Sequence, residues 1–146
     1  MLSKNTKETS KIAKEFLVKI FKKGSQNKGA LVVCLSGDLG AGKTAFTKAV
    51  AKYLNIKNKI SSPTFVIIKK YPLKKIKDFK FFFHLDAYRL KNEKELLHLG
   101  WDEIVGNKEH LVFIEWPENV PKVIPYNARF IYISHTKDGN RSFKLK

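Results

Sequence analysis

Eight residues in the first third of the chain have the types and spacing needed to bind phosphate. Residues 37–44 read GDLGAGKT and match the pattern G-x-x-x-x-G-K-S/T at every fixed position. Glycines in such a loop let successive backbone N–H groups point at one anion, and a following helix adds the partial positive charge of its N-terminus. Lys43 would reach the β- and γ-phosphates of a nucleotide, and the Thr44 hydroxyl would ligate Mg²⁺. The predicted phosphate-binding residues are Asp38, Leu39, Gly40, Ala41, Gly42, Lys43 and Thr44.

Two carboxylates follow apolar runs and are candidates for the metal site. Mg²⁺ held by a hydroxyl and phosphate oxygens needs a nearby carboxylate, usually through water at the end of a neighbouring strand. Glu115 follows the run LVFI, and Asp86 follows the run FFFHL. Ligands of open α/β sheets gather beyond the carboxyl ends of the strands, so both side chains would face the γ-phosphate. These residues alone do not decide which one is the main metal-site carboxylate.

The predicted phosphate loop lies between a strand and a helix, which is the context that the motif requires. Residues 30–35 form a short apolar run with β-branched members, typical of a strand buried on both faces. Residues 46–54 repeat apolar side chains at helical spacing, as do residues 6–21 upstream. Asn5 and Glu8 have the spacing of a capping box and indicate where the first helix begins.

The rest of the chain completes an α/β pattern. Residues 92–99 predict a short helix that Gly100 ends, and Pro72 separates two strands of a hairpin. Strands are predicted at 64–71, 79–85, 111–114, 128–134 and 142–145. The fold class is therefore α/β. We expect a single P-loop NTPase-like domain over residues 1–146, built in three layers around a central mixed, largely parallel sheet of five to seven strands with flanking helices.

The composition indicates a folded, strongly basic chain. No apolar segment is long enough for a membrane span, and the N-terminus lacks a signal-peptide core, so we expect a cytoplasmic protein without membrane contact. Cys34 is the single cysteine, which excludes an internal disulfide. The net charge of +16 favours nucleic-acid binding, but a codon bias toward A and T would also produce it. Only three of the 29 basic residues are arginine: Arg89, Arg129 and Arg141.

Four motifs, in order and spacing, resemble those of the bacterial TsaE (YjeE) family. The family's GDLGAGKT run appears at residues 37–44, and its S-P-T-F/Y motif appears at residues 62–65. Its H-x-D-x-Y-R-L motif appears at residues 84–90, and its E-W-P motif at residues 115–117. Residues 139–141 are similar to a C-terminal G-R of the family, with an asparagine between the two residues. The resemblance covers nearly the whole chain.

The resemblance implies an ATPase that uses ATP and Mg²⁺ and works with two partner proteins. These partners, TsaB and TsaD, transfer a threonylcarbamoyl group to an adenosine of tRNAs that read codons beginning with A. Hydrolysis by TsaE would reset the assembly of TsaB and TsaD between turnovers, so the chain alone is expected to be a poor ATPase. Contact with tRNA through the basic surface is a further expectation.

The resemblance also implies roles for individual residues. Thr64 would sense the γ-phosphate, Asp86 would position the attacking water or the metal, and Glu115 would hold Mg²⁺ through water. Thr9 corresponds to a family threonine that borders the nucleotide. Trp116 would lie near the nucleotide or the partner surface, although packing in the core would equally explain a lone aromatic residue.

Two members of the 84–90 motif have open roles. We interpret His84 as a strand residue with a satisfied hydrogen bond rather than as a base. Arg89 lies three residues beyond Asp86, and it would pair with that carboxylate or contact tRNA or TsaD.

Three other functions are compatible with a phosphate loop. A GTPase would need an N-K-x-D motif, and residues 107–110 read NKEH, without the aspartate that contacts guanine. A small P-loop kinase would need an acceptor pocket and usually an arginine-bearing lid, for which this short chain has few arginines. The net charge favours a third alternative, a basic nucleotide switch that binds RNA without hydrolysing ATP.

Overall fold

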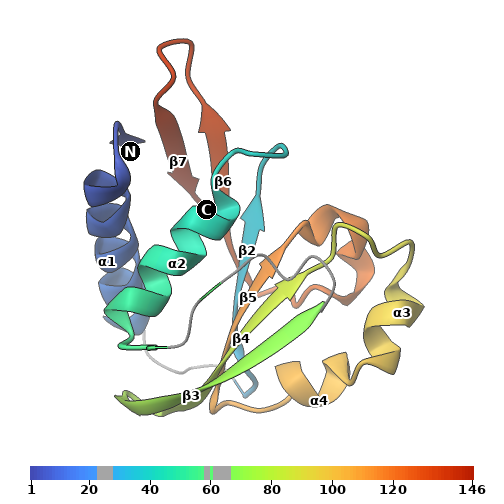
Figure 1. Ribbon diagram of the computed structural model, residues 1–146. Coiled ribbons are helices and arrows are strands. Elements are labelled where there is room, and N and C mark those ends of the chain that lie inside the picture. The colour runs from blue at the N-terminus through green and yellow to red at the C-terminus, as the bar shows by residue number, and fades with distance from the viewer. Residues whose placement is uncertain (23–27, 58–59, 61–66) are drawn as a thin grey trace.

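A mixed sheet of seven strands crosses the centre of the described part of the protein (Figure 1). The computed structural model describes residues 1–22, 28–57, 60 and 67–146. The strands lie in the order β1-β7-β6-β2-β5-β4-β3. In chain order, β1 to β7 span Leu2–Ser3, Leu31–Ser36, Ile68–Ile76, Phe79–Asp86, His110–Glu115, Arg129–His135 and Arg141–Leu145.

The centre of the sheet is parallel and its edges are antiparallel. Strand β2 pairs in parallel with both β5 and β6, and β4 pairs in parallel with β5. At one edge β3 runs antiparallel to β4, and at the other β7 runs antiparallel to β6 and β1. The prediction of a mixed sheet is confirmed, with the parallel pairs confined to the four central strands. Their carboxyl ends therefore meet at one edge.

Helices cover both faces of the sheet, so the predicted three layers are confirmed. Helices α1 and α2 pack on one face, and α3 and α4 lie on the other (Figure 1). None of the helices in the described ranges is long and apolar enough to span a bilayer. The helices α1 to α4 span Thr6–Lys22, Lys43–Tyr53, Glu93–His98 and Trp101–Val105, and the 3₁₀ turns η1 and η2 span Pro117–Asn119 and Pro121–Val123.

Each face of the sheet has its own core. On the side of α1 and α2, the fully buried Phe46 ring lies 6.0 Å from the Phe16 ring and 5.6 Å from the Phe143 ring, measured between centroids. On the other side Trp101 is fully buried, and its indole N–H donates to Val123 O at 2.9 Å. Both cores rest on the parallel strands, of which β2 and β5 are buried along nearly their whole length because both of their faces are covered.

Most predicted elements are confirmed, and three details differ. Pro72 does not end its strand: β3 continues through it to Ile76, with an irregularity in pairing between these two residues. A proline is tolerated there because β3 is an edge strand, where a missing N–H need not break the ladder. The helix α4 and the short strand β1 were not predicted. At the start of α1, Asn5 Oδ1 accepts from Glu8 N at 2.9 Å, but the Glu8 carboxylate accepts from Lys4 N rather than from Asn5 N.

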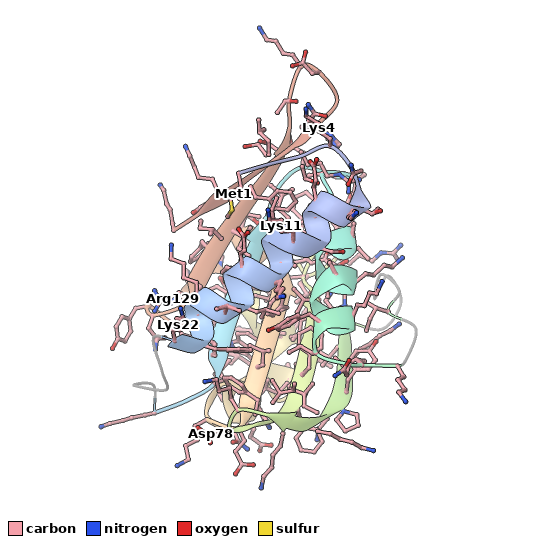
Figure 2. All side chains as sticks on the ribbon, turned by 90° about the vertical axis from the view of Figure 1, so that its left-hand side faces the viewer. Met1, Lys4, Lys11, Lys22, Asp78 and Arg129 are labelled. Atoms are coloured by element: carbon pink, nitrogen blue, oxygen red, sulfur yellow. The ribbon has the colours of Figure 1, made fainter. Side chains whose placement is uncertain are left out.

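The outer surface of α1 carries part of the positive charge. Lys11 and Lys22 are exposed, and Figure 2 shows both on the solvent side of this helix. The opposite side of the helix is buried against the core through Ile12, Phe16 and Ile20. This helix therefore has the amphipathic pattern that its sequence predicted.

We expect Phe46→Ala to lower the free energy of unfolding by about 3–5 kcal/mol, because it removes a fully buried ring that joins α1, α2 and β7. Denaturant titration of the purified chain measures this change. Lys52→Ala, on the exposed side of the same helix, is the control and should stay within about 0.5 kcal/mol of wild type. Equal effects of the two substitutions would contradict the assigned core.

Candidate functional site

The glycine-rich loop, residues 37–44, connects the end of β2 to the first turn of α2. Two of its glycines are required by geometry. Gly42 has a φ of +114°, and a Cβ atom there would lie 2.9 Å from the Arg141 side chain. A Cβ atom on Gly37 would lie 2.3 Å from the carbonyl oxygen of Ile133. Residues other than glycine rarely adopt the φ of Gly42, and a Cβ atom does not fit at Gly37. The backbone of the loop can therefore take this conformation only with glycine at both positions.

Lys43 is the first residue of α2, and its side chain folds back over the loop. It is only 5% exposed, and its Nζ donates to Gly37 O at 2.5 Å and to Asp38 O at 2.9 Å. The same nitrogen lies 4.3 Å from the centroid of the Trp116 ring. Burial lowers the pKa of Lys43, although nearby carboxylates, Glu115 above all, act in the opposite direction. The ammonium group therefore lies where an anion would be favourable.

The parallel register of β4 and β5 places the two predicted carboxylates side by side. Asp86 pairs with Glu115 at the carboxyl ends of these strands. The Thr44 hydroxyl donates to the Glu115 carboxylate, with distances of 3.3 and 3.4 Å to its two oxygens. Asp86 Oδ1 accepts from Tyr88 N at 2.9 Å, and burial raises the pKa of Asp86. Hydroxyl and carboxylate oxygens thus converge beside the loop.

These groups share one pocket of about 270 Å³. Most of the residues predicted from the sequence line it, and three further residues, Ala45, Tyr88 and Arg89, complete the described lining. Of the predicted loop residues, Asp38 is exposed and contributes its carbonyl to Lys43, whereas Ala41 is buried in the core beneath the loop. The predicted residues that line the pocket are Leu39, Gly40, Gly42, Lys43, Thr44, Asp86, Glu115 and Trp116.

His84 contacts the site from the interior of the sheet. It is fully buried on β4, and its Nε2 lies 2.5 Å from Glu115 Oε2. Its Nδ1 has no hydrogen-bond partner among the described residues. The sequence interpretation was therefore right about the strand position and incomplete about the contact. The signal was present in the spacing, because His84 precedes Asp86 by two residues and so points to the same face of β4.

Trp116 combines the two roles that the sequence left open. Its backbone has a φ of +59°, which is rare for an aromatic residue. Its ring lies 5.0 Å from the ring of the exposed Tyr88 and lines the pocket beside Lys43. The same side chain is partly buried and packs against the core beneath α3 and α4. It therefore forms a wall between this core and the pocket.

The lining described for this pocket does not include two other predicted residues, Thr9 and Thr64. Thr64 falls outside the described residues. Thr9 is buried in α1, where its hydroxyl lies 2.8 Å from the hydroxyl of Ser3. It lines a second pocket, of about 230 Å³, together with His135 and Arg141. This second pocket adjoins the glycine-rich loop, since His135 Nε2 lies 2.9 Å from Gly40 O and Arg141 lies against Gly42.

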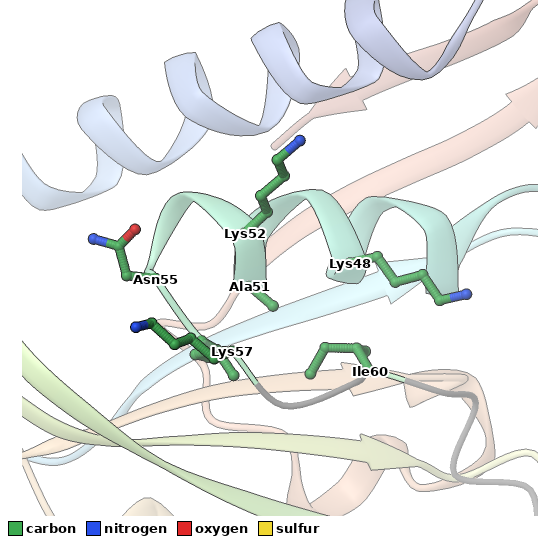
Figure 3. Close-up of a pocket in the computed structure, with 7 residues that line it drawn as sticks. Lys48, Ala51, Lys52, Asn55, Lys57 and Ile60 are labelled. Atoms are coloured by element: carbon green, nitrogen blue, oxygen red, sulfur yellow. The ribbon is translucent and has the colours of Figure 1, made fainter.

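A larger pocket, of about 480 Å³, lies at the far end of α2 (Figure 3). Ala51 and Ile60 form part of its apolar lining, and the Lys48, Lys52 and Lys57 side chains surround it (Figure 3). Its described lining contains no carboxylate. Size therefore does not identify the functional site here. The smaller pocket beside the glycine-rich loop contains the ammonium, hydroxyl and carboxylate groups that could bind phosphate and a metal ion.

A mixed sheet with a parallel centre and a glycine-rich loop between a central strand and a helix defines an α/β fold of the P-loop type. Residues 3–143 match the family described as "Threonylcarbamoyl adenosine biosynthesis protein TsaE". The chain belongs to the TsaE family.

Individual relatives agree with this assignment. A Bacillus subtilis protein named tRNA threonylcarbamoyladenosine biosynthesis protein TsaE is 37% identical over 94% of this chain and 78% of its own length. A protein of the same name from Rickettsia prowazekii is 36% identical over 86% of this chain and 82% of its own. The crystal structure of Bacillus subtilis YdiB is similar with a TM-score of 0.75 and 31% identity, over 99% of this chain and 82% of that one.

We expect His84→Leu to lower the free energy of unfolding by about 3–5 kcal/mol, because Glu115 would lose its closest partner while remaining buried. The double substitution of His84→Leu with Glu115→Met removes both groups and should restore most of this loss. Denaturant titration of the two single variants and the double variant measures the coupling. Purely additive losses would contradict a direct interaction between the two side chains.

Proposed function

We propose that this chain is a Mg²⁺-dependent ATP-binding protein and weak ATPase that supports TsaB and TsaD in threonylcarbamoyladenosine modification of tRNA. The observation that carries the proposal is the contact between Thr44 and Glu115 beside a buried Lys43 at the end of the glycine-rich loop. The relatives' names place the family in tRNA threonylcarbamoyladenosine biosynthesis.

The oxygen atoms in the pocket suit Mg²⁺. The ion prefers oxygen ligands and is usually bound by one or two side chains together with phosphates and waters. Thr44 and Glu115 supply a hydroxyl and a carboxylate close to one another. Among the described residues, no group of three or more histidine, cysteine, aspartate or glutamate side chains is arranged to hold a metal ion by itself. When bound, Mg²⁺ would offset negative charge on the phosphates during transfer.

Lys43 is prepared for the phosphates by its present partners. Its Nζ donates to two loop carbonyls, which are neutral acceptors. Exchanging them for ionised phosphate oxygens would give shorter and stronger, charge-assisted hydrogen bonds. Burial lowers the pKa of this lysine, and the negative charge of a bound phosphate would act in the opposite direction and favour the charged ammonium group. The net effect favours the nucleotide-bound arrangement.

Asp86 is suited to positioning a water molecule. One carboxylate oxygen accepts from the backbone N–H of Tyr88, which fixes the orientation of the group. Burial raises the pKa of Asp86, which makes this carboxyl a better proton acceptor than an exposed aspartate. Phosphoryl transfer needs mainly a positioned water molecule and neutralised charge, and Asp86 would supply the first of these.

We place the nucleoside in the pocket that Thr9 lines. This pocket adjoins the glycine-rich loop through His135 and Arg141, so one ligand can reach both pockets across the loop. The absence of an N-K-x-D motif favours adenine over guanine. Arg141 lies against Gly42 and would contribute a positive charge near the phosphates.

The rim of the phosphate pocket supports dependence on partners. Leu39 is 73% exposed and Tyr88 is 49% exposed, which are high values for large apolar or aromatic side chains at a reaction site. A protein partner that covers this rim would bury apolar area and exclude bulk water, while leaving room for the water molecule that Asp86 positions. The isolated chain should therefore hydrolyse ATP slowly. A small P-loop kinase is the alternative, and it would need an acceptor molecule in place of a partner.

Lys43→Ala is expected to abolish ATP hydrolysis and to weaken ATP binding strongly, because it removes the cation that contacts the phosphates. Binding of a fluorescent ATP analogue and release of phosphate are the measurements. Lys48→Ala, one turn further along the exposed side of α2, keeps the helix and should behave as wild type. Unchanged turnover by the folded Lys43→Ala variant would refute the assignment of the loop.

Addition of TsaB and TsaD from the same organism should raise the ATPase rate of this chain, because a covered rim excludes bulk water and so strengthens the electrostatic interactions around the phosphates and the one positioned water molecule. A tRNA modification assay, with and without this protein and ATP, tests the role directly. We expect repeated rounds of tRNA modification by TsaB and TsaD only when this protein and ATP are both present. An unchanged ATPase rate and modification that proceeds equally without the chain would count against the proposed role.

A further inference from the structure

Along β6 and β7, core residues alternate with aromatic and basic residues. The aromatic and basic side chains therefore share one face of the hairpin. Along β6, Ile131 and Ile133 are buried on the side of α1 and α2, so Phe130 and Tyr132 point to the opposite side. The register pairs Tyr132 with Lys144, and Phe130 exchanges backbone hydrogen bonds of 3.0 and 2.9 Å with Lys146. We call Phe130, Tyr132, Lys144 and Lys146 the aromatic–lysine face.

The two rings of this face are nearly parallel. The centroids of Phe130 and Tyr132 lie 6.0 Å apart, with an angle of 16° between the ring planes. Tyr132 is 39% exposed, and Lys146 Nζ lies 5.7 Å from its centroid. Both lysines are exposed, whereas Phe130 is partly buried because it also packs against the core beneath α3 and α4. The face therefore offers a fixed aromatic ring with cations beside it.

The helices of the second layer do not extend over this part of the sheet. Helices α3 and α4 cover the region of β4 and β5, and Figure 1 shows the β6-β7 hairpin projecting beyond them. Towards the edge of the sheet the exposed surface continues through Ser134 and Ser142 to the exposed Leu2 of β1. An antiparallel sheet usually presents a polar surface on its solvated side, whereas here an exposed Tyr132 ring stacks with the partly buried Phe130 ring.

We propose that the aromatic–lysine face binds single-stranded RNA. Bases stack on exposed aromatic rings, and lysines beside the rings neutralise the phosphates that connect the bases. A flat sheet face with aromatic side chains suits unpaired nucleotides, because the faces of paired bases are hidden inside a duplex. The net charge of +16 supplies the long-range attraction for a polyanion.

The charge pattern favours RNA over a protein as the occupant. The rings are flanked by Lys144 and Lys146 on the β7 side, and the Glu118 carboxylate lies on the β2 side. There, Ser36 pairs with Tyr132 and donates a hydrogen bond to the Glu118 carboxylate. Glu118 would repel a phosphate, so the strand of RNA would approach from the β7 side. The proposed role in tRNA modification identifies tRNA as the natural source of the unpaired segment, and only this choice of source rests on that role.

The test uses the full chain and a fluorescein-labelled, unstructured RNA oligonucleotide, with the duplex that it forms with its complement as comparison. Fluorescence anisotropy measures binding. We expect Tyr132→Ala to weaken binding of the single strand by about fivefold or more, and Tyr132→Phe to retain it, because stacking needs the ring and not the hydroxyl. Binding of the duplex should change little with either substitution.

The chain offers a matched control for the aromatic ring. Tyr53 is also 39% exposed, but it lies on α2 on the other side of the sheet. Tyr53→Ala should leave RNA binding unchanged. Equal losses in Tyr53→Ala and Tyr132→Ala, or no loss in either, would overturn the proposal.

The lysines are tested by the salt dependence of binding between roughly 50 and 200 mM salt. Replacing Lys144 and Lys146 by glutamine should reduce the slope of log K against log salt by about 1.4, for two lost phosphate contacts on a single strand. The control replaces Lys11 and Lys14 on α1 by glutamine. An equal change of slope in this control would show that RNA binds to positive charge on other surfaces as well as on the aromatic–lysine face. This result would also overturn the proposal.

Two further measurements separate this inference from the proposed function. Tyr132→Ala should bind a fluorescent ATP analogue as wild type does and should keep its melting temperature, because Tyr132 lines neither nucleotide pocket. If wild type binds RNA through Tyr132 but fails to bind ATP, the proposed function fails and the RNA face stands. If Tyr132→Ala keeps its RNA affinity but loses co-purification with TsaB and TsaD, the face is a protein interface and the RNA proposal fails.

Discussion

The buried charge of Glu115 is the constraint on which the site depends. A carboxylate inside a protein is costly unless hydrogen bonds and charges compensate it. Here the Thr44 hydroxyl approaches it from the glycine-rich loop, His84 contacts it from the neighbouring strand, and Lys43 lies nearby. These partners come from two elements, since Lys43 and Thr44 lie in the first turn of α2 and His84 lies on β4, so the position of Glu115 depends on the register of β5 with both of its neighbours. A shift of one residue would turn this carboxylate to the other face.

This dependence explains how much could be predicted from the sequence. The glycine-rich loop and the carboxylates Asp86 and Glu115 were found because each is signalled locally, by a motif or by an apolar run that ends in an acid. The parallel centre of the sheet then places them together. The contact between His84 and Glu115 could not be derived in this way, because it joins two strands across 31 positions of sequence. The sequence indicated only, through the spacing of two residues, that His84 and Asp86 lie on the same face of β4.

The misses in the fold have the same origin. Pro72 reads as a break in any local pattern, and it is tolerated only because its strand lies at the edge of the sheet. The five-residue helix α4 is too short to have a period of its own, and it is held by the burial of Trp101. The pocket around Thr9 forms where the start of the chain meets Arg141 near its end. Such contacts are set by tertiary packing, which sequence patterns do not encode locally.

The β6-β7 hairpin connects the two surfaces that matter for function. Its turn region contacts the glycine-rich loop, because His135 lies against Gly40 and Arg141 against Gly42. Its length carries the aromatic–lysine face, and Tyr132 pairs with Ser36, the last residue of β2 before the loop. A nucleotide that moves the loop must therefore displace side chains of the hairpin or be resisted by them. Because packed elements transmit strain, the same two strands place the proposed nucleotide site and the proposed RNA-binding face in direct mechanical contact.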